Sequence, residues 1–175
     1  MVLVRAKLED FNTLQDICIR AYAGNYSDHW LENGLELFLE KEFGNDKLAK
    51  DLGEELFTYY FIFVGEAIRG FMKVDYNLPI PEYPEKSSEL VKIYVLPECK
   101  GKGYGSAAML ELISLLRGQG KENLFLYVIN SNIEGIAFYK KMGFSYYGKS
   151  RIEAPSFREE LRDMDCMRLI LDSRQ

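Results

Sequence analysis

Residues 95–109 read VLPECKGKGYGSAAM, a stretch in which a β-strand ends, a glycine-rich loop follows and a helix begins. Glycines at three alternate positions let backbone N–H groups point at one spot, and the start of a helix adds partial positive charge. Two lysines add full charges. The stretch therefore predicts a cradle for a pyrophosphate, and a glycine-rich turn without a ligand is the alternative. The predicted cradle consists of Lys100, Gly101, Lys102, Gly103, Tyr104, Gly105 and Ser106.

Two other phosphate-binding patterns occur in the chain. GYGSAA (103–108) fits the dinucleotide pattern G-x-G-x-x-A, but the next strand, NLFLYVIN (123–130), ends without an acid that could hold a ribose. GFSYYGKS (143–150) matches the P-loop pattern G-x-x-x-x-G-K-[ST], but a helix precedes it and no clear helix follows. We interpret the second stretch as the end of a helix followed by a strand.

The spacing of hydrophobic residues predicts the other elements. Gly24 is expected to end the first helix and Gly143 the last. The order β-α-α-β-β-β-α-β-α-β-β indicates an α/β fold, a mixed sheet with helices on both faces, in a single domain over 1–175. Strands are expected at 2–6, 57–64, 67–76, 88–95, 123–130, 144–150 and 165–171, and helices at 8–23, 34–52 with a break near residue 44, 103–120 and 132–142.

Composition narrows the class of protein. The 175 residues are 47% hydrophobic, enough for a sizeable core, and no window approaches the roughly 18 uncharged apolar residues of a membrane span. The start, MVLVRAKLED, lacks the apolar core of a signal peptide, and three scattered cysteines indicate reduced thiols in a cytoplasmic protein. His29 is the only histidine, so a multi-histidine metal site is excluded and we expect no metal.

Charge is distributed unevenly along the chain. Residues 1–90 carry 17 acids and 9 bases, whereas residues 91–175 carry 10 acids and 13 bases. The balances of −8 and +3 fit ordinary solvated surface, or else a second half that binds an anion and a first half that lines a path for a cation. The overall charge of −5 makes nucleic acid a poor partner.

Two linked motifs resemble those of the GNAT superfamily of acetyl-CoA-dependent N-acetyltransferases. KGKGYG (100–105) is similar to the phosphate loop [QR]-x-x-G-x-[GA], and Lys100 at its first position keeps the charge but loses a planar side chain. NIEGIAFYKKMGF (132–144) meets N-x-x-[AG]-x-x-[FL]-Y-x-x-x-G-F in full. The spacing of the motifs and the element order also agree with this family, whose mixed sheet is mostly antiparallel. Within it, the chain looks most similar to bacterial spermidine/spermine N-acetyltransferases, on general likeness.

The resemblance implies direct transfer of acetyl from acetyl-CoA to a primary amine in a ternary complex. The pantetheine arm would dock at Ile93, Tyr94 and Val95, where the fourth and fifth strands part. Asn132 would hydrogen-bond the arm. The alternative is that Asn132 is a helix N-cap, and the two roles can coexist.

The resemblance also implies the groups that move protons. Tyr139, with a pKa near 10, would protonate the leaving thiolate. Glu89 would accept the proton of the ammonium, directly or through water. Core packing is the alternative for Tyr139, and simple exposure is the alternative for Glu89.

An acceptor pocket is expected near Tyr26, Trp30, Glu32 and Glu89, with packing or exposure as the alternative for each. A polyamine such as spermidine or spermine would suit the acidic first half, including the loop PEYPEK (81–86) beside Glu89. Aminoglycoside-like amines, amino acids, protein N-termini and protein lysines are alternative acceptors. A non-catalytic acyl-CoA sensor of the same fold is an alternative function, and a homodimer is left open.

Overall fold

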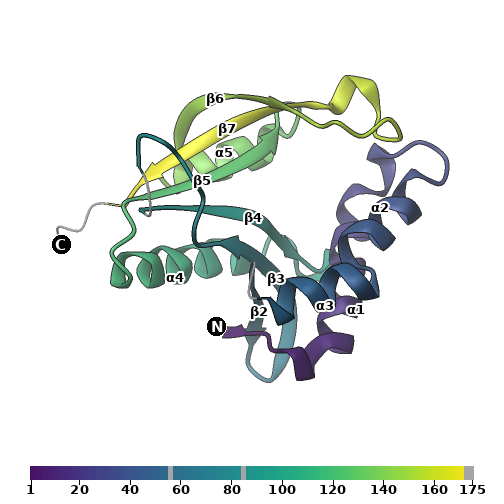
Figure 1. Ribbon diagram of the computed structural model, residues 1–175, viewed down its shortest axis with the longest axis horizontal. Coiled ribbons are helices and arrows are strands. Elements are labelled where there is room, and N and C mark those ends of the chain that lie inside the picture. The colour runs from purple at the N-terminus through teal and green to yellow at the C-terminus, as the bar shows by residue number, and fades with distance from the viewer. Residues whose placement is uncertain (55–56, 84–85, 172–175) are drawn as a thin grey trace.

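The computed structural model describes residues 1–54, 57–83 and 86–171, whose strands form one sheet in the order β1-β2-β3-β4-β5-β7-β6 (Figure 1). Every ladder is antiparallel except the β4–β5 pair, and this confirms the predicted α/β fold with a mostly antiparallel sheet. The strands are β1 (Val2–Arg5), β2 (Thr58–Val64), β3 (Ala67–Asp75), β4 (Ser87–Val95), β5 (Asn123–Ile129), β6 (Ser145–Arg151) and β7 (Asp163–Ile170). The helices are α1 (Phe11–Tyr26), α2 (Gly34–Phe43), α3 (Asn45–Gly53), α4 (Tyr104–Gly118) and α5 (Ile133–Lys141).

The single parallel ladder is short. β4 and β5 pair only at Ser87–Asn123, Ser88–Leu124 and Glu89–Phe125, and the rest of β4 has no ladder with β5. On its other side β4 follows β3 to its end, with a bulge at Val91, because Lys73 pairs with Lys92 and Val74 with Leu90. The two strands therefore diverge at the centre of the sheet.

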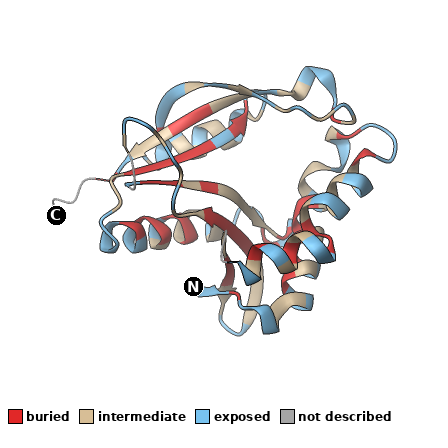
Figure 2. Ribbon diagram, viewed as in Figure 1, coloured by how far each residue is buried: buried red, intermediate tan, exposed pale blue. Residues whose placement is uncertain are grey.

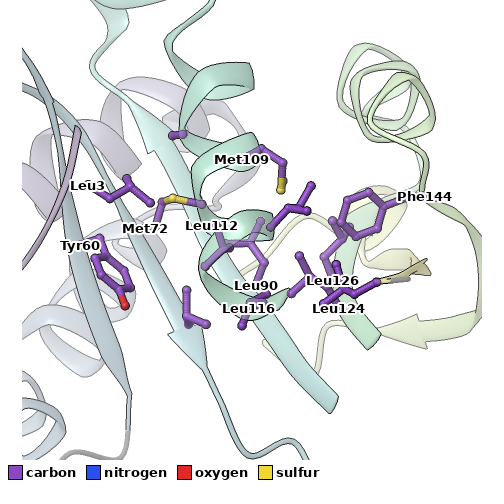
Figure 3. Close-up of a cluster of buried hydrophobic side chains, with 14 of the residues drawn as sticks. Leu3, Tyr60, Met72, Leu90, Met109, Leu112, Leu116, Leu124, Leu126 and Phe144 are labelled. Atoms are coloured by element: carbon purple, nitrogen blue, oxygen red, sulfur yellow. The ribbon is translucent and has the colours of Figure 1, made fainter. Parts of the chain in front are cut away.

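One face of the sheet is covered by α4 and α5. Met109, Leu112 and Leu116 of α4 pack on strand residues that include Leu124 and Leu126 (Figure 3). Figure 2 shows the buried residues gathered on the central strands and on the side of α4 that faces them. This hydrophobic cluster holds the helix that carries the predicted cradle against the middle of the sheet.

The opposite face is covered by α1, α2 and α3, and helices therefore lie on both faces as expected. Leu14, Cys18 and Ala21 of α1 are fully buried against strand residues such as Phe71. Gly143, which follows the α5 C-cap Met142, has a φ of 95°, and this left-handed conformation favours glycine at the end of the helix.

The expected end of the first helix at Gly24 was wrong, since α1 continues to Tyr26. Gly24 instead lies against the ring of Pro97, and a Cβ built on it would be 2.3 Å from the Pro97 Cγ. The glycine allows a close approach between α1 and the turn that leads to α4. Within the described residues, no helix is long and apolar enough to cross a membrane.

Candidate active site

A cleft of 1180 Å³ opens where β4 and β5 diverge. Its wall comes from the end of α1, part of α2, the diverging part of β4, the loop before α4, the second half of β5 and the start of α5. Segments 152–154 and Phe157, far along the chain, complete it. The two sequence motifs are thus brought to one site.

The predicted cradle lies in this cleft at the start of α4, a helix of 15 residues. Gly101 and Gly103 have φ values of 73° and 77°, in the left-handed region. A Cβ added at either of them, or at Gly105, would meet no heavy atom within 4 Å. In the described part of the chain, no N–H of residues 101–106 donates to another group. This open array of donors fits a pyrophosphate. All of the predicted cradle residues line the cleft except Lys102, whose side chain is exposed outside it.

The predicted docking edge is the diverging part of β4. Ile93, Tyr94 and Val95 line the cleft, and this stretch of the strand has no ladder partner on the β5 side. Its backbone can therefore pair with amide groups of an extended ligand. Asn25 at the end of α1 donates a hydrogen bond from Nδ2 to the Val95 carbonyl at 3.2 Å, and this bond ties the edge to α1.

Asn132 and Tyr139 enter the cleft from α5. Asn132 is the N-cap of this helix, since its Oδ1 accepts a hydrogen bond from the Gly135 N–H at 2.9 Å. Tyr139 packs its ring on Phe144, with centroids 5.8 Å apart. Burial raises the pKa of Tyr139 above its usual value, and the negative charge that Tyr26 would carry if ionised adds to this effect. Its hydroxyl is therefore protonated at neutral pH.

Aromatic side chains line the cleft beyond Tyr139. Tyr26 stacks on Tyr22 and contacts Tyr94, with ring centroids 5.1 Å and 5.3 Å apart. Trp30 is 9% exposed and packs between Phe38 and Phe157. Tyr26 and Trp30 thus border the cleft, whereas Glu32 is exposed outside it.

Glu89 does not line the cleft. It lies half-buried on β4, paired with Phe125 at the end of the parallel ladder and opposite Asp75 on β3. Burial raises its pKa, and the like charge of Asp75 raises it further. The structure therefore places Glu89 at the point of divergence, next to the cleft rather than in its wall.

Sequence reasoning missed several residues of the cleft, above all Lys92 and Glu42. Periodicity could have indicated two of the missed residues, because Tyr22 lies one helical turn before Tyr26 and Lys92 lies two positions before Tyr94 on the same face of β4. No sequence signal indicated Phe157, which reaches the site only through a bridge to Trp30. The other missed residues of the cleft include Asn25, His29, Phe38 and Tyr127.

Comparison with known proteins agrees with this architecture. The model of the acetyltransferase (GNAT) family matches residues 13–144. A spermidine N(1)-acetyltransferase of Thermoplasma acidophilum is 23% identical over 144 residues, which are 80% of this chain and 85% of that protein.

Solved structures share the fold. The PaiA N-acetyltransferase of Thermoplasma acidophilum, crystallised in complex with coenzyme A, matches with a TM-score of 0.72 at 20% identity over 97% of this chain and 99% of that one. The ribosomal-protein-S18-alanine N-acetyltransferase of Escherichia coli matches with a TM-score of 0.67 at 19% identity, over 98% and 94% of the two chains. By the family match, which spans most of the chain and both motifs of the cleft, this protein belongs to the acetyltransferase (GNAT) family, whose members take acetyl from acetyl-CoA.

Proposed function

We propose that the protein transfers acetyl from acetyl-CoA to a primary amine by direct attack of the amine on the thioester. The observation that carries this proposal is one cleft that contains both an open cradle of backbone donors, at the start of α4, and a half-buried phenol, Tyr139, on α5. Such a cleft can hold the donor at its phosphates and supply a proton at its reacting end.

Each part of the cleft has a role in this proposal. The N–H groups of residues 101–106 and the side chain of Lys100 hold the phosphates, and the free edge of β4 pairs with the pantetheine arm. Tyr139 donates a proton to the leaving thiolate. Glu89 lies beside the cleft, so we propose that it takes the ammonium proton through water.

Two observations support a polyamine as the acceptor. One relative is named a spermidine N(1)-acetyltransferase, and residues 1–90 carry a balance of −8. Residues 84 and 85 of the acidic loop PEYPEK (81–86) lie outside the described residues. Amines that carry an anionic oxygen are the second candidate class, and they are supported by Lys92 in the cleft wall.

The test is release of free CoA from acetyl-CoA with a panel of amines that includes spermidine, spermine, amino acids and short peptides. We expect release that depends on the amine. Tight binding of acetyl-CoA without release for any amine would instead indicate a sensor. The single domain over 1–175, the cytoplasmic location, the lack of a nucleic-acid partner and the oligomeric state stay predictions from the sequence.

A further inference from the structure

Lys92 on β4 brings an ammonium group into the part of the cleft lined by Tyr22, Phe38 and Tyr94. Its side chain is 12% exposed, and the residue lines the cleft together with Glu42 and Phe38. The Lys92 Nζ lies 3.5 Å from Oε1 of Glu42 and 5.9 Å from the centre of the Phe38 ring. The ammonium therefore lies between a carboxylate and an aromatic ring.

The carboxylate next to Lys92 already has a closer partner. Oε1 of Glu42 accepts a hydrogen bond from Lys73 Nζ at 2.8 Å. Lys73 also pairs with Asp51 at 3.0 Å, and Asp51 is in turn bound by Lys47 and by the Tyr59 hydroxyl. Lys47, Lys73 and Lys92 thus share two carboxylates, those of Glu42 and Asp51.

Among Lys47, Lys73 and Lys92, Lys92 has the longest distance to its carboxylate partner. It is also the one of the three that lines the cleft. An ammonium has three N–H donors and no acceptor. The other ionisable groups near it are Glu89, farther along β4, and the buried thiol of Cys18 on α1. Donors of Lys92 are therefore available to a ligand in the cleft.

The chemistry of this corner distinguishes the two candidate acceptor classes. A protonated polyamine offers only donors and positive charge, so it cannot satisfy Lys92 and is repelled by it. A carboxylate offers acceptors and the opposite charge, and it would form a charge-assisted hydrogen bond in a poorly hydrated site. The aromatic rings of Tyr22, Phe38 and Tyr94 would surround the apolar part of such a ligand.

We propose that Lys92 anchors a carboxylate of the acceptor, and hence that the acceptor is an amino-acid-type amine rather than a polyamine. The amine part of this inference rests on the proposed acetyl transfer, whereas the carboxylate part rests on Lys92 alone. Binding and turnover can therefore be tested separately.

The binding test uses pairs of amines that differ only by a carboxylate: phenylalanine with phenethylamine, and lysine with cadaverine. Affinity is measured by calorimetry on the protein saturated with CoA. We expect the carboxylate to improve affinity about tenfold or more in at least one pair, because hydrogen bonds to charged groups are among the stronger ones. The ratio should fall to about one in Lys92→Met, which keeps most of the length of the side chain and loses the charge.

Two further variants separate the anchor from general charge effects. Lys92→Arg keeps a cation and should keep most of the preference, whereas Lys50→Met removes an exposed lysine outside the cleft and should leave it unchanged. CoA binding by each variant serves as the check that it is folded. A preference that survives in Lys92→Met, or spermidine binding tighter than every carboxylate-bearing amine, would overturn the anchor.

Turnover distinguishes the two proposals. If the carboxylate preference appears in binding but no amine releases CoA, the anchor stands and the proposed acetyl transfer fails. If CoA is released fastest with spermidine and Lys92→Met changes nothing, the acetyl transfer stands and the anchor fails. Acetylation of Lys92 itself by acetyl-CoA, detected by mass spectrometry, would also overturn the anchor.

Discussion

Glu89 of β4 and Phe125 of β5 are the last pair of the only parallel ladder in the described sheet, and beyond them the two strands separate. Strand separation of this kind exposes backbone donors and acceptors inside the sheet rather than at its edge. The bulge at Val91 adds a second irregularity to β4 close to this point. The carboxylate of Glu89 lies at this point of divergence, next to the cleft.

The cradle is tested by adding bulk and charge at its centre. Gly103→Glu should abolish CoA binding, because Gly103 has a φ of 77° and borders the free N–H groups at the start of α4. A carboxylate there would compete for the donors and repel phosphate. Calorimetry with CoA measures the loss, and binding of ATP or NAD by the wild type is expected to be undetectable.

Gly65→Glu is the matched control. Gly65 lies in the turn between β2 and β3 with a φ of 62° and no heavy atom within 4 Å of an added Cβ. Both variants therefore carry a similar backbone strain and the same added charge, and only one lies in the cleft. Equal CoA affinity in the two variants would show that the phosphates do not bind at residue 103.

The proposed acid is tested by Tyr139→Phe. The ring contacts with Phe138 and Phe144 survive the change, so the melting temperature should hardly move. Loss of a positioned acid should lower kcat by about 10²-fold or more. Because burial holds the pKa of Tyr139 above 10, the wild type should keep this contribution as the pH rises to about 9.

Tyr147→Phe gives the comparison for Tyr139→Phe, since Tyr147 packs on Phe125 outside the cleft. We expect normal kcat in that variant. If Tyr139→Phe also turns over normally, Tyr139 serves only packing, and the leaving thiolate takes its proton from another group.

The proposed base is tested through the pH dependence of kcat/KM. A base acts when it is ionised, and burial with the nearby charge of Asp75 raises the pKa of Glu89. The rate should therefore increase as the pH rises through this raised pKa, above the usual 4.3 or so of a glutamate. Asp75→Asn removes the like charge and keeps the oxygen that accepts the Asn77 N–H, so the acidic limb should move to lower pH.

Glu89→Gln completes the test of the base. It should lower kcat/KM more at neutral pH than at high pH, where the amine is already deprotonated. An acidic limb that is the same in wild type, Asp75→Asn and Glu89→Gln would show that another group, or the amine itself, controls the rate.

Local patterns predicted the elements that depend on short-range chemistry. The glycines and lysines of 100–105 indicated the cradle because the backbone itself supplies the donors. Asn132 and Tyr139 were indicated by the resemblance of residues 132–144 to the family motif. Both motifs line the same cleft. The fold was therefore predictable from local patterns, and the proposed donor site stays a prediction whose two motifs lie in one cleft.

The part of the cleft around Lys92, which we propose binds the acceptor, was less predictable because it is assembled from distant segments. Glu42 and Lys92 are 50 positions apart and meet only because the fold brings the end of α2 close to Lys92 of β4. A net balance of −8 in the first half did not reveal that Glu42 is neutralised by lysines from two strands. Gly24 was misread for a similar reason, since the ring of Pro97 that it contacts is remote in sequence.

The buried ion pairs behind the cleft should matter for stability. Lys73 is 2% exposed and contacts Glu42 and Asp51, and Asp51 is fully buried. Lys73→Met should lower the free energy of unfolding by about 3 kcal/mol, because a buried carboxylate loses a partner. Urea unfolding measures the change, with Lys50→Met as the surface control, for which we expect at most about 0.5 kcal/mol.

Acid should reveal the same interaction. Burial alone would raise the pKa of Asp51, but bonds from Lys47, Lys73 and Tyr59 outweigh it and lower the pKa. The stabilisation is therefore complete above the unfolded value of about 3.9 and is lost as the pH falls below it. This acid-side loss should shrink in Lys73→Met, and an identical pH dependence in both proteins would contradict the role assigned to Lys73.

The contact between α1 and the turn before the cradle is tested by Gly24→Ala. Alanine in a helix is usually more stable than glycine by about 0.5–1 kcal/mol. Here the new methyl group would lie 2.3 Å from the Pro97 Cγ, so the helix and the turn must move apart. We expect the free energy of unfolding, measured in urea, to fall by about 1–3 kcal/mol, as for overpacking. CoA binding should also weaken, because the 97–99 turn leads into the cradle.

Gly118→Ala in α4 is the control. No heavy atom lies within 4 Å of a Cβ added there, so this variant should show the usual gain in stability of alanine over glycine. Equal gains in the two variants would mean that the turn yields freely and that Gly24 does not fix its position.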